Sequence, residues 1–460
     1  MKLDYFQYQN DGGALLASKD RWGLHDEMGV GKTATVWNAV ERAGMERGIV
    51  VCPAFLRENW IGEYRKFVRT PRRLCKGMNI HDYYAWQRGK FDILVTSYEQ
   101  ATAWSNNVRK TFEVLDFVAL DEAHFLKNSG AKRTKAIMGE DLAGLNGMIE
   151  WSQHVWHVTG TPMANDPQDI YTFLRMCWAT SLSETTFTDR YFHKTRTRFG
   201  ARMTPRPEMV SELQALIANN SIRRTKRDIG IQLPPIHLTS TLVDGDTEQV
   251  RHLLSEYPGL ERAIVAAVEQ GGLSFLDAQH IGTLRRLVGE AKSVPYGYML
   301  HEELTSGASD KRVVYGIHVD ALTNLRDFLW KNNIYAVLVN GQTPEKERQA
   351  AVRAFQEDPR CQVFIGNIRA AGVGITLTAA CEIDILESDW SPAGNAQAIM
   401  RVHRIGQHRT VHARFITLAR SIDEMVNRVV AHKTASIASI EGEAMTAAPL
   451  DVLGQISLTS

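Results

Sequence analysis

Short runs of apolar residues that end in polar or glycine-rich turns recur along the chain, and each predicts a buried β-strand. In the first half these runs are GIVVCP (48–53), FDILVTSYE (91–99), DFVALDEAH (116–124) and HVWHVTGTP (154–162). Segments with helical periodicity follow several of them, for example RENWIGEYRKF (57–67). Because strands and helices alternate, the pattern predicts a parallel α/β sheet, which binds ligands at the carboxyl ends of its strands.

The second half of the chain repeats this pattern, whereas the segment between the halves is more helical. The second set of predicted strands is KRVVYGIHV (311–319), IYAVLVNG (334–341), CQVFIGN (361–367), EIDILESD (382–389) and HARFITLA (412–419). We therefore predict an α/β protein with two parallel-sheet lobes, at 1–180 and 311–440. A mainly helical insertion and crossover at 181–310 connects the lobes, and a flexible tail at 441–460 follows them.

Composition and charge narrow the class of protein. The 460 residues suffice for about two to three domains with full hydrophobic cores. The formal net charge is +1, so a nucleic-acid surface must be a local patch. The five cysteines form no CxxC pair, which argues against a zinc ribbon or a disulfide framework. The chain also lacks the apolar core of a signal peptide and an apolar run long enough to span a bilayer. We expect a soluble cytoplasmic protein with no membrane partner.

The segment DEMGVGKT (26–33) has the composition of a phosphate-binding loop. Glycines let the backbone wrap anionic oxygens with its N–H groups, Lys32 brings positive charge to the phosphates, and the Thr33 hydroxyl can ligate Mg²⁺. The candidate loop residues are Gly29, Val30, Gly31, Lys32 and Thr33. The strict pattern has glycine where this chain has Asp26, and the preceding RWGLH is a weak strand. A chance surface turn is therefore an alternative at this point.

A second motif argues against chance. The apolar run FVALDEAH (117–124) contains two adjacent carboxylates, Asp121 and Glu122, at the predicted strand end. Asp121 can hold the water shell of Mg²⁺, and Glu122 can orient and deprotonate the attacking water. An isolated Asp-Glu pair is usually a solvated turn, but one that follows a GKT loop by about 90 residues is poorly explained by chance. We predict that the first lobe binds and hydrolyses a nucleoside triphosphate.

Further segments resemble, in order, the motifs of a superfamily-2 helicase-type motor of the Swi/Snf type. The matching segments are YFQYQNDG (5–12), VVCPAFLRENWIGEYRKF (50–67), VTSYEQ (95–100), LDEAHFLKN (120–128), VTGTPMANDPQDIY (158–171), IRRTKRDIGIQLPP (222–235), VNGQTPEKERQAAVRAFQ (339–356), AAGVGITLTAA (370–380) and QAIMRVHRIGQ (397–407). The resemblance implies two RecA-like lobes and ATP with Mg²⁺ as cofactors. It also implies that Gln9 reads the adenine base and that Arg21 lies near the nucleotide.

The resemblance assigns further roles around the phosphate that is transferred. Gln397, Arg401 and Arg404 fall in motif VI, on a second-lobe helix that faces the nucleotide. The two arginines, one helical turn apart, would share a face of that helix and act as arginine fingers. A solvated basic helix is the alternative for this segment. The residues predicted to couple the nucleotide state to the TGT motif are His124, Thr159, Gly160 and Thr161.

Within this class the chain is most similar to the HARP-like, annealing-helicase branch. The similarity is carried by LRRLVGEAKSVPYGYMLHEEL (284–304) and NIRAAGVGITLTAA (367–380). It implies an ATP-driven DNA helicase or translocase that acts on duplex DNA, forks or four-way (Holliday) junctions and remodels them by branch migration. A translocase that only displaces proteins from duplex DNA, and a binding module with an inactive ATPase, are the alternatives. We expect a minimal bacterial or phage form that acts as a monomer.

Two basic segments are candidates for DNA contact, because phosphate contacts set affinity without a sequence code. FHKTRTRFGARMTPR (192–206) has five Lys or Arg residues and no acidic residue, and RRTKR (223–227) has four. The residues predicted to bind DNA are Lys194, Arg196, Arg198, Arg223 and Arg224. A solvated loop is the ordinary alternative for both segments.

Overall fold

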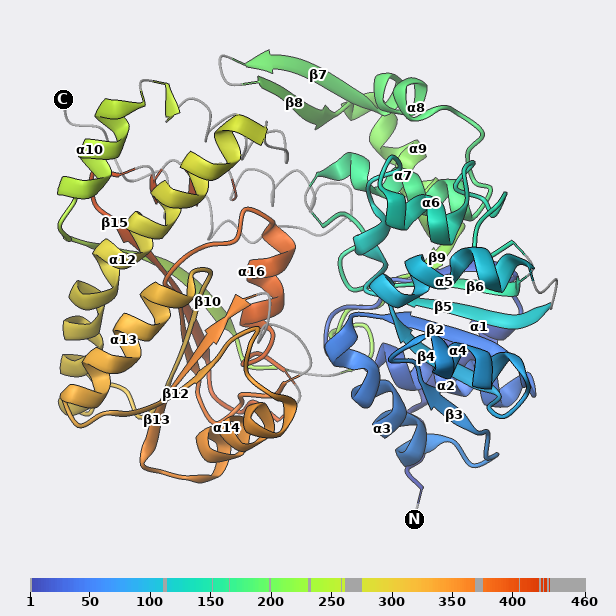
Figure 1. Ribbon diagram of the computed structural model, residues 1–460, viewed down its shortest axis with the longest axis horizontal. Helices are drawn as coiled ribbons and strands as arrows, with labels where there is room; N and C mark the ends of the chain where they lie inside the picture. The colour runs from blue at the N-terminus through green and yellow to red at the C-terminus, as the bar shows by residue number, and fades with distance from the viewer. Residues whose placement is uncertain are drawn as a thin grey trace. The chain divides into compact units, whose positions relative to one another are not determined.

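The chain divides into two compact units, each built on a parallel sheet (Figure 1). The computed structural model describes residues 2–430 except 111–113, 151, 165, 198–199, 231–232, 258, 261–274, 369–374, 405, 422, 425 and 428–429. Unit 1 comprises Met1–Phe192 and Pro205–Gln232, and unit 2 comprises His193–Thr204 and Leu233–Ser460. The predicted pair of parallel-sheet lobes is therefore confirmed. None of the helices in the described ranges is long and apolar enough to cross a membrane.

The sheet of unit 1 has seven parallel strands in the described part of the chain, in the order β3-β4-β2-β5-β6-β1-β9. These strands are β1 (Arg21–Leu24), β2 (Gly48–Cys52), β3 (Leu74–Lys76), β4 (Ile93–Ser97), β5 (Leu115–Asp121), β6 (Ser152–Val158) and β9 (Ser221–Ile222). The α-helices of this unit are α1 (Gln7–Ala17), α2 (Lys32–Arg42), α3 (Arg57–Phe67), α4 (Ile80–Gln87), α5 (Tyr98–Lys110), α6 (Lys132–Met138), α7 (Tyr171–Met176), α8 (Glu184–Tyr191) and α9 (Pro207–Ala218). Short 3₁₀ helices are η1 (Ala54–Leu56), η2 (Ala123–Leu126) and η3 (Pro167–Ile170).

The register of unit 1 brings the ends of three strands together. Val158 at the end of β6 pairs with Leu24 at the end of β1 on one side and with Asp121 at the end of β5 on the other. The weak RWGL segment forms β1 because β6 and β9 pair with it on both sides. The segments that follow β1, β5 and β6 therefore leave the same edge of the sheet, where parallel sheets bind their ligands.

The sheet of unit 2 has six parallel strands among the described residues, in the order β10-β15-β14-β11-β13-β12. These strands are β10 (Ile236–Val243), β11 (Arg312–Gly316), β12 (Tyr335–Val339), β13 (Cys361–Asn367), β14 (Glu382–Ile385) and β15 (Val411–Leu418). The helices of this unit are α10 (Glu248–Glu256), α12 (Phe275–Thr305), α13 (Val319–Lys331), α14 (Glu345–Glu357) and α16 (Pro392–Ile399).

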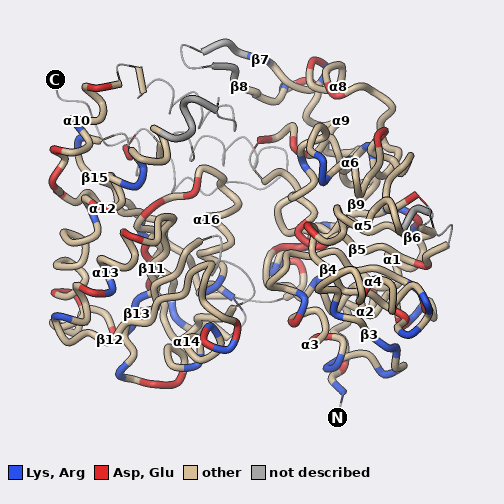
Figure 2. The backbone as a smooth tube through the Cα atoms, in the orientation of Figure 1, with Lys and Arg blue, Asp and Glu red and all other residues tan. Residues whose placement is uncertain are grey.

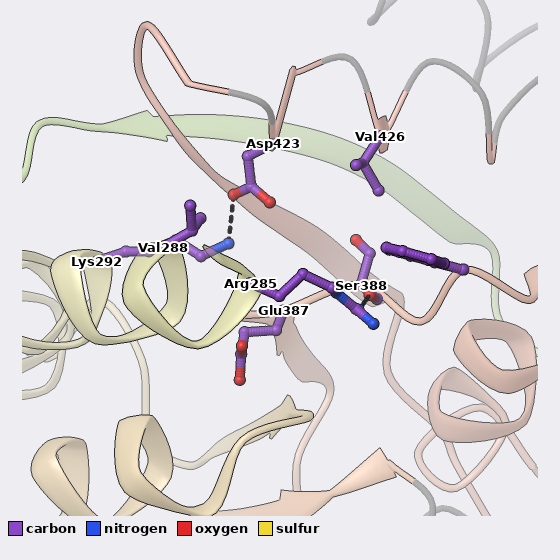
Figure 3. Close-up of a pocket in the computed structure, with 8 residues that line it drawn as sticks. Arg285, Val288, Lys292, Glu387, Ser388, Asp423 and Val426 are labelled. Atoms are coloured by element: carbon purple, nitrogen blue, oxygen red, sulfur yellow. Dashed lines mark hydrogen bonds and ion pairs between the residues drawn. The ribbon is translucent and has the colours of Figure 1, made fainter. Parts of the chain in front are cut away.

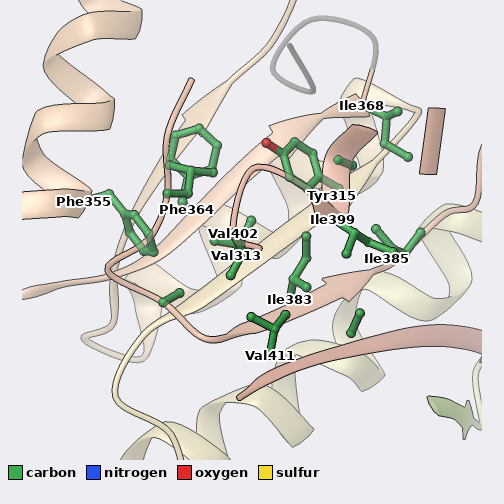
Figure 4. Packing of buried hydrophobic residues seen from close by; sticks show 14 of the residues in the cluster. Val313, Tyr315, Phe355, Phe364, Ile368, Ile383, Ile385, Ile399, Val402 and Val411 are labelled. Carbon is green, nitrogen blue, oxygen red and sulfur yellow. The ribbon is translucent and has the colours of Figure 1, made fainter. Parts of the chain in front are cut away.

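Both faces of the second sheet are buried, which explains its nearly continuous apolar strands. Successive residues of β11 alternate between two clusters. Val313 and Tyr315 pack in one cluster with Phe355 of α14 (Figure 4). Val314 packs in the other with Leu325 of α13. The helical patterns between the predicted strands thus form the layers that cover this sheet.

The segment predicted as a helical insertion, 181–310, contributes to both units. It carries α8, α9, α10 and α12, and it also forms the two-stranded sheet of β7 (Phe192–Thr197) and β8 (Gly200–Pro205). Two further strands of the segment extend the main sheets, since β9 pairs with β1 and β10 pairs with β15. The division between the units falls between Gln232 and Leu233. The predicted boundaries at 180 and 310 stay predictions, and the predicted tail at 441–460 lies outside the described residues.

Candidate active site

The DEMGVGKT segment forms the turn between β1 and α2 at the ligand-binding edge of unit 1. Gly29 and Gly31 have φ angles of 85° and 88°, a left-handed backbone that favours glycine. Gly31 caps the N-terminus of α2, where unpaired backbone N–H groups and the helix dipole favour an anion. The Lys32 ammonium donates to the backbone oxygens of Asp26 (2.9 Å) and Glu27 (3.2 Å). Burial lowers the pKa of Lys32, so a phosphate would stabilise its charged form.

The carboxylates predicted for hydrolysis lie at the end of β5. Asp121 is buried, its Oδ2 accepts from Trp60 Nε1 at 2.7 Å, and its Oδ1 accepts from the backbone N–H of Glu122 at 3.0 Å. Burial, together with the charge of Glu122, raises the pKa of Asp121 to about 7. Such a carboxylate becomes more acidic when a cation approaches it.

Glu122 has an unusual backbone conformation. Its φ of 50° and ψ of 46° lie in the left-handed region, which costs energy for a residue with a side chain. His124 Nδ1 lies 3.3 Å from Glu122 Oε2 and 3.2 Å from Thr159 Oγ1. The structure therefore links the predicted general base to the TGT motif through one imidazole.

The TGT motif packs directly against the phosphate loop. The backbone N–H of Thr159 donates to Leu24 O at 3.1 Å, and the N–H of Thr161 donates to the Thr159 hydroxyl at 3.1 Å. A Cβ atom on Gly160 would lie 2.7 Å from Met28 Cγ and 3.1 Å from Lys32 Nζ. Only glycine allows so close an approach, so Gly160 of the motif lies next to Lys32.

Gln9 also lies at the loop. It is buried on α1, its Oε1 accepts from the backbone N–H of Phe6 at 3.0 Å, and its Nε2 would lie 2.6 Å from a Cβ atom on Gly31. The side chain predicted to contact adenine is thus within reach of the turn that carries Lys32.

Arg21 does not lie where the resemblance implied. It begins β1, whereas the phosphate loop follows the other end of that strand. Its guanidinium stacks over the ring of Trp178 at 4.5 Å, and a Cβ atom on Gly144 would lie 3.3 Å from its Nη2. The prediction that Arg21 binds ATP is therefore corrected, because parallel strands present ligands at their carboxyl ends.

The residues predicted to hold Mg²⁺ fit a hard cation. The Asp121 carboxylate and the Thr33 hydroxyl offer oxygen atoms, which Mg²⁺ prefers, and both residues belong to the edge described above. Within the described ranges no group of three or more His, Cys, Asp or Glu side chains could hold a metal ion.

Two of the residues predicted to contact DNA lie at the start of the phosphate loop. Arg224 forms an ion pair with the fully buried Asp26, and its side chain is only 13% exposed. Arg223 Nη1 donates to His25 O at 3.1 Å. The prediction of DNA contact by Arg224 is corrected, because a buried carboxylate such as Asp26 requires a charged partner.

The other predicted DNA contacts belong to unit 2. Lys194 is exposed on β7, Arg196 lies in the same strand, and Arg198 lies outside the described residues. Basic and acidic positions are interspersed over each unit (Figure 2), in keeping with the net charge of +1. A DNA-binding surface must therefore be local, as the composition predicts.

Motif VI lies in unit 2, but its arginines do not lie on a helix. Gln397 is buried in α16, which ends at Ile399, so Arg401 and Arg404 lie in the turns that follow. Beyond the helix, Arg401 O accepts from Leu377 N at 2.9 Å. Arg404 Nη1 donates to Ile375 O at 3.0 Å. The predicted shared helical face is therefore wrong, although both arginines remain close in sequence and anchored to the same neighbouring segment.

Sequence reasoning missed several buried partners of the residues predicted to be catalytic. Trp60 and Tyr98 hold the end of β5, since the Tyr98 hydroxyl donates to Asp121 O at 2.7 Å and Trp60 holds the Asp121 carboxylate. His25 Nε2 lies 3.1 Å from His157 Nδ1 beside the phosphate loop. No sequence signal separates these side chains from ordinary core residues.

The buried histidine pair should make unit 1 sensitive to acid. Burial, together with the charge of His124, lowers the pKa of His157 to about 3, and burial lowers that of His25. In the unfolded chain each imidazole has a pKa of about 6.5 and takes up a proton that the folded chain excludes. Stability should therefore fall as pH decreases below about 6.5, by about 1.4 kcal/mol per pH unit for each histidine.

Denaturant unfolding between pH 6.5 and 4.5 checks this expectation. In the variant His157→Gln, the free energy of unfolding should depend on pH less steeply than in the unmodified protein, by about 1.4 kcal/mol per pH unit. His154→Gln is the matched control, because His154 lies on the same strand but is only partly buried, with its ring 3.0 Å from Lys19 O. Equal slopes in all three proteins would mean that His157 is not neutral in the folded state.

A phosphate loop after β1, an Asp-Glu pair at the end of β5 and a second parallel-sheet unit that carries motif VI are together typical of two-lobe, helicase-like nucleoside triphosphatases. The chain belongs to the SNF2-related family of helicase-like ATPases. Residues 8–271 match the SNF2-related domain, and residues 298–406 match the helicase conserved C-terminal domain.

The curated relatives are longer proteins. The SWI/SNF-related matrix-associated actin-dependent regulator of chromatin subfamily A-like protein 1 of Drosophila melanogaster is 26% identical over 434 residues, which cover 93% of this chain and 54% of that protein. The DNA annealing helicase and endonuclease ZRANB3 of Bos taurus is 24% identical over 442 residues, 93% of this chain and 39% of that protein. A solved SWI2/SNF2 ATPase core of Sulfolobus solfataricus in complex with dsDNA is 22% identical, with coverage of 96% and 94% and a TM-score of 0.44.

Proposed function

We propose that the protein is an ATP-driven motor that moves along duplex DNA and remodels forks or four-way junctions by branch migration or strand annealing. One observation carries the nucleotide half of this proposal: Lys32, Glu122 and the TGT motif converge at one edge of unit 1. The DNA half is supported by relatives that are named as annealing helicases and chromatin regulators. This chain spans only part of each of those proteins, so its own substrate requires a direct test.

In this proposal the chain supplies each part of the hydrolysis. Lys32 and the N-terminus of α2 bind the phosphates, and Glu122 accepts a proton from the attacking water. Bound Mg²⁺, held by Thr33 and Asp121, would neutralise charge on the phosphate oxygens. Arg401 and Arg404 of motif VI stabilise the charge that develops in the transition state.

His124 offers a route from the nucleotide to the rest of unit 1. Its ring contacts the carboxylate of Glu122 and the hydroxyl of Thr159, and Thr159 in turn bonds to the strand that leads into the phosphate loop. A change in the hydrogen bonds of Glu122 on hydrolysis would therefore reach the TGT motif directly. We propose that this link makes motion depend on the state of the nucleotide.

The proposed substrate is tested by ATPase assays with six conditions: no nucleic acid, single strand, linear duplex, fork, four-way junction and RNA. The proposal expects stimulation by duplex and greater stimulation by forks and junctions of equal length. Equal stimulation by duplex and junction would instead favour a translocase that displaces bound proteins without changing strand pairing. Greater stimulation by RNA, or none by any DNA, would overturn the proposal.

The basic segment around β7 should contribute to the preference for branched DNA. Replacing Lys194, Arg196 and Arg198 together by Gln should erase that preference while ATPase activity without DNA stays the same. Phosphate contacts release counterions, so the slope of log affinity against log salt should become shallower by up to roughly three. Fluorescence anisotropy over a salt series measures this slope. An unchanged slope would show that these residues do not contact phosphate.

A further inference from the structure

The segment 220–227, here called the clamp segment, runs beside β1 and the start of the phosphate loop. Backbone N–H groups on the loop side donate to it at regular intervals: Gly23 to Asn220 O (2.9 Å), His25 to Ile222 O (2.8 Å) and Glu27 to Arg224 O (2.9 Å). The bonds from Gly23 and His25 belong to the pairing of β1 with β9, and the bond from Glu27 lies beyond the sheet. The ladder thus continues from the strand into the loop itself.

Buried charges reinforce this backbone ladder. Asp26 is fully buried, and its Oδ1 accepts from the backbone N–H (3.0 Å) and Nε (2.9 Å) of Arg224, while its Oδ2 accepts from Arg224 Nη2. Arg224 also donates to Tyr8 O, and the Tyr8 hydroxyl donates to Val30 O at 2.9 Å. The Arg224 guanidinium therefore connects Asp26, at the start of the loop, with helix α1, whose Tyr8 contacts the loop again at Val30.

A second ion pair repeats the arrangement at the next loop residue. Lys226 is 4% exposed, its ammonium donates to Glu27 Oε1 at 2.7 Å, and its backbone N–H donates to Glu27 Oε2 at 2.8 Å. Two successive loop residues are thus held by two residues of the clamp segment. Charge-assisted, multiply bonded pairs of this kind fix geometry more firmly than neutral hydrogen bonds.

The clamped residues are the ones that hold the phosphate-binding lysine. The Lys32 ammonium donates to the backbone oxygens of Asp26 and Glu27, whose side chains are bonded to Arg224 and Lys226. We propose that Arg224 and Lys226 are positioning residues that set the conformation of the phosphate loop and thereby the affinity for ATP. This inference deepens the nucleotide half of the proposed function and does not depend on the DNA half.

The test compares ATP binding with stability. Lys226→Met removes the charge at similar length, and Arg224→Lys keeps the charge but loses the planar fork that grips Asp26. Each variant should raise the Kd of a fluorescent ATP analogue and the KM for ATP by on the order of tenfold, while kcat at saturating ATP changes less than about threefold. All measurements are made without DNA. If the proposed action on DNA is wrong, DNA will not stimulate the ATPase activity of the unmodified protein, and this result is separate from the ATP-binding measurements.

Lys292→Met is the matched control for a structural effect. Lys292 is 1% exposed in unit 2 and forms an ion pair with Asp423 (Figure 3). Its loss should lower the melting temperature about as much as Lys226→Met, because each variant removes a buried ammonium from a partly buried carboxylate. The KM for ATP should not change in this control. A rise in KM in the control equal to that in Lys226→Met would overturn the proposal by reducing it to general destabilisation.

A double variant keeps the proposal testable if Lys226→Met does not fold. Glu27→Gln with Lys226→Met removes both charges, and buried pairs replaced together are tolerated far better than pairs broken on one side. Because Lys226 is proposed to act through Glu27, the double variant should raise the KM for ATP no more than either single change. A folded double variant with the KM of the unmodified protein would overturn the role of Lys226, and additive effects would show that Lys226 acts on ATP by another route.

Discussion

Replacing Glu122 by Gln should lower kcat for ATP hydrolysis by about two to four orders of magnitude. The amide has the shape of the carboxylate but cannot accept a proton from the attacking water. ATP should still bind, because Lys32 and the N-terminus of α2 hold the phosphates without Glu122. Single-turnover hydrolysis measures the loss, and equilibrium binding of a fluorescent ATP analogue measures the affinity.

Glu99→Gln is the matched control for this substitution. Glu99 also follows a strand of the same sheet. Its side chain, however, is 65% exposed, and its Oε1 lies 3.8 Å from Arg133 Nη2, which is long for an ion pair. Its replacement should leave kcat unchanged. A Glu122→Gln protein that no longer binds ATP would give Glu122 a structural role, a possibility that its left-handed backbone makes worth testing. Full activity in that variant would place the general base elsewhere.

The strands were predictable because buried parallel strands leave a local signal. Runs such as those that become β5 and β13 are mostly apolar and mostly buried, as is typical of parallel strands with helices on both faces of the sheet. The candidate catalytic pair was predictable for the same reason, because two adjacent carboxylates such as Asp121 and Glu122 stand out at the end of an apolar run. Where the chain carries a strong local pattern, the sequence and the structure agree.

The errors arose where tertiary contacts decide. The four residues of β1 carry little apolar pattern and form a strand because two neighbours pair with them. Arg401 lies in a turn after α16, and its carbonyl oxygen accepts from Leu377, which is distant in sequence. Neither partner could be identified from local periodicity.

The same limit explains the misassigned cations. A run such as RRTKR is equally compatible with a solvated surface and with DNA contact, and only the structure shows Arg224 and Lys226 paired with Asp26 and Glu27. Arg21 was placed near ATP by its position in the sequence, although its side chain stacks on Trp178. The partner of a charged residue depends on three-dimensional geometry, which a single sequence does not specify.

Replacing Arg404 by Ala should lower kcat by about a thousandfold or more and change the KM for ATP much less. An arginine finger acts mainly on the charge that develops in the transition state, so binding of the ground state is largely spared. Arg404 can serve in this way while Nη1 donates to Ile375 O, because a guanidinium has five N–H donors. Steady-state ATPase assays at saturating DNA separate kcat from KM.

Two further variants identify what Arg404 does. Arg404→Lys keeps the positive charge but not the planar fork, so it should recover only part of the lost kcat. Arg409→Ala is the control within the same basic segment, because Arg409 is 47% exposed and lies 3.6 Å from Asp310. If Arg404→Ala weakens DNA binding as much as it weakens hydrolysis, motif VI is a DNA-binding stripe. If Arg409→Ala lowers kcat as much as Arg404→Ala, the effect comes from the net charge of the segment. An arginine finger depends on one guanidinium at one position, so removal of a neighbouring arginine should not have the same effect.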